Sequence, residues 1–198
     1  METILRWDTE FFLFLNGFHT DFGNLFWYYV SQIWTWFPLY IFIIYCLARK
    51  FKKRAWVIVP LFFLMILLTD QTCNLVKKTV QRPRPSHTEA IMDEIQLVQK
   101  PDGTYYYGGK YGFPSAHAAN SMALAFAVFF FLGRGKKWVL PTMIAWSLVL
   151  AYSRIYLGVH YPLDILTGFC VGALWAWLMS SAYFRFEERR NSGSQRQR

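Results

Sequence analysis

The sequence is poor in cysteine, and its three cysteines form no familiar pattern. Cys46, Cys73 and Cys170 lie far apart in apolar stretches, and none belongs to a Cys-x-x-Cys motif. An odd number of widely spaced cysteines argues against a disulfide framework and against a zinc site. We therefore expect buried free thiols and no bound metal.

Charged residues are also scarce. Only 17% of the 198 residues are charged, whereas 55% are hydrophobic and 20% aromatic, and the charges gather between long apolar runs. Such a composition is not that of a water-soluble domain. The net charge of +9 raises the question of nucleic-acid binding, but basic clusters that flank apolar segments are typical of membrane topology. We expect an integral membrane protein that binds no nucleic acid.

Five apolar segments approach the length of about 20 residues that a helix needs to cross a bilayer. They cover residues 25–48, 55–76, 116–132, 138–156 and 162–184. Pro38 lies inside the first segment and predicts a kink there. The fold class is therefore an all-α bundle of five to six transmembrane helices.

The number of spans depends on the N-terminal segment. The stretch from Ile4 to Gly17 is apolar but short, and Arg6, Asp8 and Glu10 interrupt it. We interpret it as a helix that lies in the membrane interface, with a sixth span as the alternative.

The positions of lysine and arginine predict the orientation. With five spans, the basic clusters at 49–54, 134–137 and 185–198 fall on the same side of the membrane. The positive-inside rule makes that side cytoplasmic. The loop 79–113 and the turn near Val159 then face the periplasm or the cell exterior. Residues 1–190 form a single transmembrane domain in this interpretation, and the polar tail 191–198 is expected to be disordered in the cytoplasm.

Three short motifs combine basic residues with histidine, and the predicted topology places all three on the outer face. In chain order they are Lys77-x6-Arg84-Pro85, Pro114-Ser115-Ala116-His117 and Ser153-Arg154-x5-His160-x3-Asp164. A lone histidine or arginine at the end of a span is more often a cap or a topology anchor. Because three such groups fall on one face, we interpret them as one site.

The basic members of these motifs suit phosphate. Lys77, Arg84 and Arg154 place positive charge at a membrane boundary, where unpaired charge is costly. Guanidinium groups match the bidentate geometry of phosphate oxygens. Ser115 stands where a helix N-cap belongs, and the first backbone N–H groups after it, from Ala116 onward, are placed to bind an anion.

The histidines suit phosphoryl transfer. His160 and Asp164 are four residues apart at the start of the last span, close enough for the carboxylate to orient the imidazole. An oriented, neutral imidazole is a competent nucleophile. His117, on another helix, is then free to act as the general acid for the leaving oxygen.

The three motifs together resemble the signature of the type 2 phosphatidic acid phosphatase family, which reads K-x6-RP, PSGH and SR-x5-H-x3-D. The resemblance covers roughly residues 77–164. It implies that Lys77, Arg84, Arg154, Ser115 and the backbone near Ala116 bind phosphate. It makes His117 the acid, His160 the nucleophile that forms a phosphohistidine, and Asp164 its orienting partner. The family requires no metal or other cofactor.

One motif position departs from the family. Ala116 stands where glycine is usual. Alanine has no conformational penalty in the first turn of a helix, so we expect little effect there. A left-handed backbone at this position would weaken the assignment of these residues to a phosphate-binding loop.

Two features lie outside the motifs. Asp70 shares a helix face with Lys77, and we expect it to pair with a lysine or arginine in a structural role, although a buried acid in a span is also a functional candidate. Residues 95–107 contain Pro101-Asp102-Gly103 between β-prone runs, which predicts a short β-hairpin over the site. A headgroup-selecting role and simple surface decoration are equally compatible with it.

The resemblance predicts a phosphatase acting on a membrane lipid, in the cell membrane, with the site facing outward. Undecaprenyl pyrophosphate is the favoured substrate, with lipid A and phosphatidylglycerophosphate as alternatives. Two rivals belong to other classes: a vanadium haloperoxidase, whose members are larger and not membrane-spanning, and a non-catalytic lipid-binding or transport protein. The lipid bilayer is the one expected environment, and no obligate protein partner is indicated.

Overall fold

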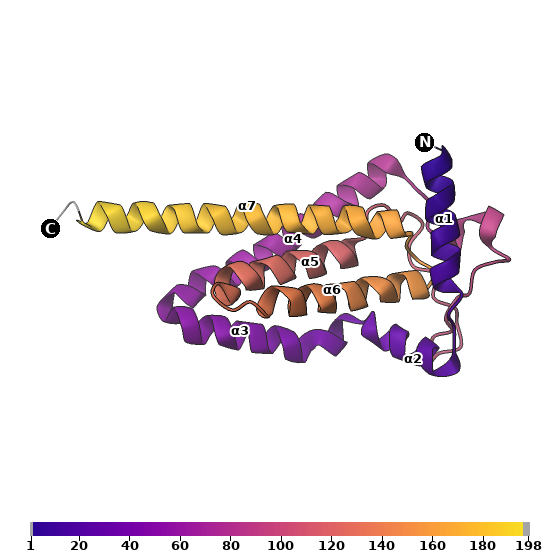
Figure 1. Cartoon of the computed structure of the whole chain (residues 1–198), viewed down its shortest axis with the longest axis horizontal. Coiled ribbons are helices and arrows are strands. Elements are labelled where there is room, and N and C mark those ends of the chain that lie inside the picture. The colour runs from indigo at the N-terminus through magenta and orange to yellow at the C-terminus, as the bar shows by residue number, and fades with distance from the viewer. Residues whose placement is uncertain (1, 196–198) are drawn as a thin grey trace.

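The computed structural model describes residues 2–195, and the regular elements of the described chain are helices (Figure 1). The predicted all-α class is confirmed. Short 3-10 turns join the helices, and no β-strand occurs within residues 2–195. The α-helices are α1 (Glu2–Asn16), α2 (Asp21–Val30), α3 (Phe37–Phe51), α4 (Ala55–Val80), α5 (Ala116–Val128), α6 (Val139–Tyr156) and α7 (Pro162–Gln195).

Four segments of the described chain are long and apolar enough to cross a membrane. They are Ile33–Val80, Ala116–Gly133, Val139–Tyr156 and Pro162–Ser192. The first contains both α3 and α4, which run in opposite directions and are joined by the basic turn Lys52–Arg54 (Figure 1). The chain is thus a multi-pass membrane protein, while the count of five or six spans stays a prediction.

The beginning of the first span differs from the prediction. Residues 25–48 are not one kinked helix, because α2 ends at Val30 and a 3-10 turn over Ile33–Trp36 precedes α3. Pro38 lies in the first turn of α3, where a proline has no helical hydrogen bond to lose. It therefore starts a helix and does not kink one.

Helix α5 occupies the centre of the bundle, where it packs against α4, α6 and α7. Its alanines Ala118, Ala119, Ala123 and Ala125 are fully buried. Small residues let membrane helices approach closely, and α7 contributes glycine to the same contact. A Cβ on Gly168 would lie 2.5 Å from the carbonyl oxygen of Ser115. This close packing fixes the start of α5 against the start of α7.

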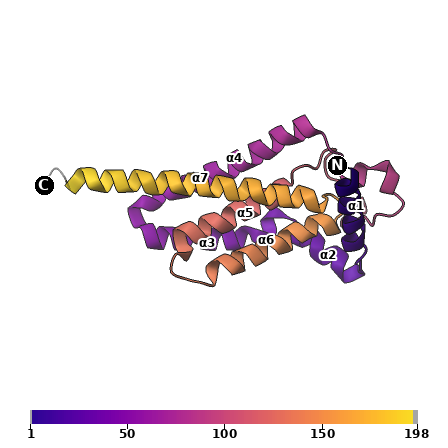
Figure 2. The same ribbon diagram turned by 45° about the horizontal axis from the view of Figure 1, so that its top comes forward.

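Helix α1 lies across one end of the bundle and does not run along it (Figures 1 and 2). Asn16 anchors it there by donating hydrogen bonds to the carbonyl oxygens of Gln96, Ile155 and Tyr156. Its outer face exposes large apolar side chains, Trp7 among them. This arrangement suits the predicted interfacial helix, whose depth in the membrane stays a prediction.

The β-hairpin predicted in the long loop at the same end is not confirmed, because no strand forms within residues 95–107. Residues 98–106 turn back on themselves, with one isolated bridge between Gln99 and Tyr105 and a backbone hydrogen bond from Tyr106 to Val98. The segment is held by packing: Val98 is fully buried against Tyr156 and Leu157. Side-chain burial thus adds to the few backbone hydrogen bonds that cross the turn.

The structure also bears on the expectations for the cysteines and for the C-terminal tail. The cysteines are free, but only Cys73 is buried, whereas Cys170 is exposed on the outside of the bundle. In the expected disordered tail, residues 191–195 continue α7, and residues 196–198 lie outside the described part of the chain. The single domain over residues 1–190 stays a prediction.

Candidate active site

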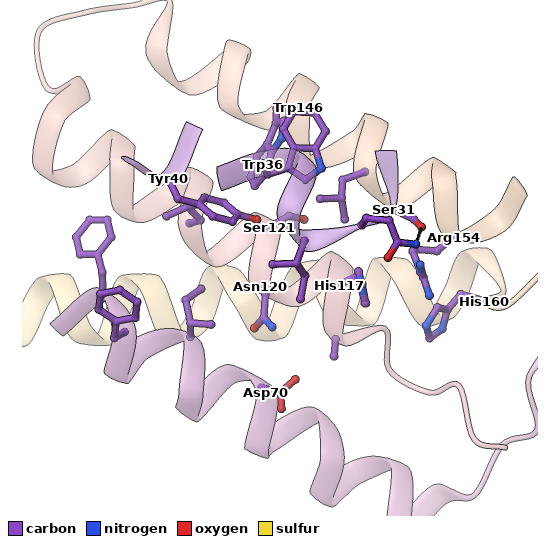
Figure 3. A pocket seen from close by; sticks show the side chains of 18 of the residues that line it. Ser31, Trp36, Tyr40, Asp70, His117, Asn120, Ser121, Trp146, Arg154 and His160 are labelled. Atoms are coloured by element: carbon purple, nitrogen blue, oxygen red, sulfur yellow. Dashed lines mark hydrogen bonds between the residues drawn. The ribbon is translucent and has the colours of Figure 1, made fainter. Parts of the chain in front are cut away.

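The three sequence motifs meet at the end of the bundle that α1 covers. A cavity of about 560 Å³ begins there and continues between α3, α4, α5 and α6 (Figure 3). Each motif contributes to its lining. The predicted site residues that line it are Lys77, Arg84, Ala116, His117, Arg154 and His160.

Arg154 is the most deeply buried cation of the site. It projects from the last turn of α6 and is 2% exposed. Its Nη2 donates to the hydroxyl of Tyr106 at 3.1 Å, but its Nε and Nη1 are buried and have no hydrogen-bond partner among the described residues. Buried donors are normally satisfied, so this guanidinium is prepared for an acceptor that enters the cavity.

Arg84 is the second buried guanidinium. Its Nε donates to the carbonyl oxygen of Tyr111 at 3.1 Å, which fixes the side chain beneath the loop. Burial lowers the pKa of Arg84 to about 10, and the nearby positive charge of Arg154 contributes to the same shift. Two like charges forced together in this way favour the binding of an anion between them.

Glycines close the cavity next to Arg84. Gly108 adopts a φ of +66°, and a Cβ there would lie 2.7 Å from Nη1 of Arg84. Gly108 and Gly109 both line the cavity. From the sequence, this glycine-rich run is discounted as a phosphate loop, because it lacks the preceding strand and the spacing of a P-loop.

His160 and Asp164 form the predicted pair. The imidazole Nδ1 lies 3.4 Å from Oδ2 of Asp164, and both residues are almost completely buried. This contact directs the opposite nitrogen, Nε2, toward the cavity that His160 lines. Burial lowers the pKa of His160 well below 6.5, and the charges of Arg84 and Arg154 lower it further. The imidazole is therefore neutral at neutral pH.

Asp164 is itself held by Arg82, a residue that the sequence analysis did not single out. Nη1 of Arg82 donates to Oδ1 of Asp164 at 2.9 Å, and its Nη2 donates to Oδ2 of Asp8 at 2.6 Å. Asp8 belongs to α1, and its Oδ1 also accepts the backbone N–H of Leu163 at 2.9 Å. A chain of charged contacts thus runs from the N-terminal helix through Arg82 to the His160 pair.

Sequence reasoning missed Asp8 and Arg82 for different reasons. Asp8 stood out only as a charge interrupting an apolar helix, and it is 74 residues from Arg82. Arg82 precedes Arg84 in the run Arg-Pro-Arg-Pro, and its guanidinium stacks 4.1 Å from the ring centre of Tyr161. The spacing of the motif selected Arg84 alone.

Ser115 acts as the predicted N-cap of α5, because its Oγ accepts the N–H of Ala118 at 3.5 Å. It is fully buried behind the cavity and does not line it, so its predicted contact with phosphate stays a prediction. Ala116 is the first residue of α5 and has a helical backbone. Glycine is therefore not required at this position.

Asp70 faces the cavity from α4 but makes no ion pair within the described chain. Its Oδ2 accepts a hydrogen bond from Nδ2 of Asn74 at 2.9 Å. The expected pairing with a lysine or arginine is therefore wrong. Asp70 lies one turn of α4 from Asn74 and two turns from Lys77, farther into the bundle.

Comparison with known proteins agrees with this geometry. The family model described as PAP2 superfamily matches residues 59–188. A lipid A 4'-phosphatase of Bacteroides thetaiotaomicron is 37% identical, over 86% of this chain and 74% of that protein. One of Porphyromonas gingivalis is 34% identical, over 96% of this chain and 78% of that protein.

A solved structure has the same fold. The crystal structure of a PAP2-type phosphatidylglycerolphosphate phosphatase from Bacillus subtilis superimposes with a TM-score of 0.66 at 21% identity. The match covers 96% of this chain and 88% of that one. At this identity the likeness concerns the fold alone. The family match over most of the chain, and the two relatives above 30% identity, decide the assignment: the chain belongs to the PAP2 superfamily and is a membrane phosphatase.

Proposed function

We propose that the protein hydrolyses a phosphate monoester on a membrane lipid through a phosphohistidine formed on His160. The proposal rests on one observation: the residues that line the cavity change from charged at one end to apolar at the other. Cations and two histidines surround its outer end, and apolar side chains of α3 and α4, such as Ile43, Leu47 and Phe62, line its inner part. A ligand that fills both parts has a phosphate at one end and hydrocarbon at the other.

The first step transfers the phosphoryl group to the enzyme. The lone pair on Nε2 of His160 attacks phosphorus, the bond from phosphorus to the lipid oxygen breaks, and His117 donates a proton to that oxygen. The bound phosphate dianion offsets the positive charges around His117, which favours the protonated imidazole. Lys77, Arg84 and Arg154 stabilise the equatorial oxygens as charge shifts in the transition state.

The second step restores the enzyme. Water attacks the phosphohistidine, neutral His117 accepts the proton of the water, and the bond between phosphorus and nitrogen breaks. His160 returns to its neutral form, and inorganic phosphate leaves. Asp164 keeps Nδ1 as the donor nitrogen throughout, so that Nε2 carries the reactive lone pair. The three cations supply the charge stabilisation that a metal ion supplies in other phosphatases.

The relatives support a choice of substrate class. The sequence favoured undecaprenyl pyrophosphate, but the two relatives above are lipid A 4'-phosphatases, which supports one of the alternatives instead. We therefore take an acylated sugar phosphate of the lipid A type as the substrate. Phosphatidylglycerophosphate is the next candidate, since a phosphatidylglycerophosphatase B of Bacillus subtilis is 28% identical over 72% of this chain.

The site is proposed to face the periplasm across the inner membrane. The basic turn Lys52–Arg54 and the loop between α5 and α6, which carries Arg134 and Lys137, lie at the end of the bundle opposite α1 (Figure 1). By the positive-inside rule that end is cytoplasmic. The cavity mouth beneath α1 is then outside, where the headgroups of outer-leaflet lipids are within reach.

The proposed nucleophile predicts a selective loss of turnover. Purified protein in detergent with EDTA is expected to release phosphate from lipid A, and His160→Ala is expected to lower the rate by about 10³-fold or more. His87→Ala is the control, since His87 is exposed on the loop between α4 and α5 and does not line the cavity. Persistent release by His160→Ala would contradict the role of His160, and no release by the folded wild-type protein would favour the non-catalytic alternative.

The lowered pKa of His160 predicts activity in mild acid. A nucleophilic imidazole works deprotonated, so kcat/KM is lost only as the pH falls through this pKa, well below 6.5. Arg84→Gln removes one of the charges that lower it, so the acid limb is expected to move to higher pH. The measurement is kcat/KM for phenyl phosphate between about pH 4 and 8 for both proteins. The substrate's own ionisation affects both profiles equally. An acid limb at the same pH in both proteins would contradict the proposed effect of Arg84 on the pKa of His160.

The chain of contacts from α1 predicts a positioning role for Asp8. Asp8→Asn weakens the hold on Arg82 and so on Asp164, and we expect kcat to fall about 10- to 100-fold, the range typical of residues that orient a functional histidine. KM is expected to stay nearly constant, and Asp8→Glu to recover part of the activity. Glu10→Gln is the control, because Glu10 is an exposed acid on the same helix. Equal effects of Asp8→Asn and Glu10→Gln on kcat would argue against the role.

A further inference from the structure

Below its cationic end the cavity carries a second level of polar groups, contributed by three helices. Asp70 comes from α4, Asn120 from α5 and Trp146 from α6, and all three line the same cavity (Figure 3). We call these three residues the inner polar level. The proposed mechanism uses none of them.

The polar atoms of this level lack partners of their own. Asn120 Oδ1 and Trp146 Nε1 are buried and have no hydrogen-bond partner within residues 2–195. Asp70 accepts one hydrogen bond, from Asn74, and joins no ion pair in that part of the chain. A polar group inside a membrane bundle is costly and usually marks a site of function.

Neighbouring polar residues at the same depth are satisfied, which sets the inner polar level apart. Thr69 lies beside Asp70, yet its hydroxyl donates to the backbone oxygen of Met65 at 2.8 Å and it does not line the cavity. Ser121 lies beside Asn120, and its hydroxyl is 2.7 Å from that of Ser147. Beside these satisfied hydroxyls, Asn120 Oδ1 and Trp146 Nε1 keep unused hydrogen-bonding capacity and both residues line the cavity.

The depth of this level can be derived from helix geometry. Asn120 is three residues beyond His117, which is about 4.5 Å along α5, and Asp70 is seven residues from Lys77, about 10 Å along α4. Trp146 is eight residues from Arg154, about 12 Å along α6. The span between these depths is comparable to a sugar ring with its attached linkages. Apolar lining follows farther in, at Leu47 and Phe62.

We propose that the inner polar level binds the polar linker of the substrate, the hydroxyl and amide groups that lie between phosphate and hydrocarbon. Asp70 and Asn120 Oδ1 accept hydrogen bonds from O–H or N–H groups, and Trp146 Nε1 donates one to a carbonyl or hydroxyl oxygen. The ligand is an acylated sugar phosphate. A polyprenyl phosphate has no such groups, and phosphatidic acid has ester acceptors but no donor.

This inference rests on the proposed phosphatase activity and adds the basis of its selectivity. A site built to hydrogen-bond a substrate discriminates strongly against an analogue that leaves its buried groups unpaired. The order along the cavity is cationic, then polar, then apolar, and it corresponds to phosphate, sugar and acyl chain. Asp70 and Asn120 are thus specificity-determining residues that contact the substrate away from the reacting atoms.

The test compares two substrates on the same variants. Asp70→Leu and Asn120→Leu keep the branched shape of the side chain, with some added volume, and remove hydrogen bonding, and kcat/KM is measured in detergent for lipid A and for undecaprenyl phosphate. The ratio of the two values is expected to fall about 10- to 100-fold in each variant. Thr69→Val is the matched control, since it removes a buried hydroxyl beside Asp70 without changing the cavity, and its ratio is expected to equal that of the wild type.

Each other outcome overturns the inference. The ratio of the two kcat/KM values stays unchanged if both fall together or if neither falls. Either result would show that Asp70 and Asn120 support the bundle and do not determine substrate selectivity. The two variants lie on different helices, so Asn120→Leu alone provides the test if Asp70→Leu does not fold. Wild-type protein that releases phosphate from neither lipid would overturn the proposed function itself, an outcome distinct from an unchanged ratio.

Discussion

The buried guanidinium of Arg154 forms no ion pair within residues 2–195. Three carboxylates lie near the site: Asp164 and Asp8 are both engaged by Arg82, and Asp70 lies deeper in the same cavity, about 10 Å or two helical turns along α4 from Lys77. Arg84 and Lys77 add positive charge around the same cavity. An apolar bundle does not hold three cations together without an anion. Burial lowers the pKa values of Arg84 and His160, and the neighbouring positive charges lower them further, an excess of charge that a phosphate dianion would balance.

Close helix packing makes this concentration of charge possible. Helix α5 carries alanine where it meets its neighbours, and Gly168 and Gly172 of α7 let the two backbones approach until a Cβ would collide with α5. As a result, the first turn of α5, with His117, and the first turn of α7, with Asp164, share one end of the bundle. The backbone N–H of Ser115 donates to the carbonyl oxygen of Asp164 at 2.8 Å and fixes these two starts against each other. The position of the proposed acid relative to the proposed nucleophile thus depends on small residues that only pack.

Much of this site could be predicted from the sequence, because its cations and histidines recur at fixed short spacings and all fall at the ends of apolar runs. The contacts of Asp8 could not be predicted, since they join a helix near the N-terminus to Arg82 and Leu163, and nothing local indicates such a partner. The predicted hairpin is not confirmed for a related reason: Val98 packs with Leu157, a long-range contact that local β propensity does not indicate, and the chain reverses with an isolated bridge and no strand within residues 95–107. Pro38 was misread because a proline signals a helix start and a kink alike.

The central claim is that His160 carries the phosphoryl group during turnover. The most direct measurement is to mix the protein with lipid A labelled in its phosphate, quench in alkali, which preserves a phosphorus–nitrogen bond, and locate the label by mass spectrometry of peptides. The account predicts the phosphoryl group on His160, with none on His117. Label on His117, or turnover with no labelled histidine at any quench time, would contradict it.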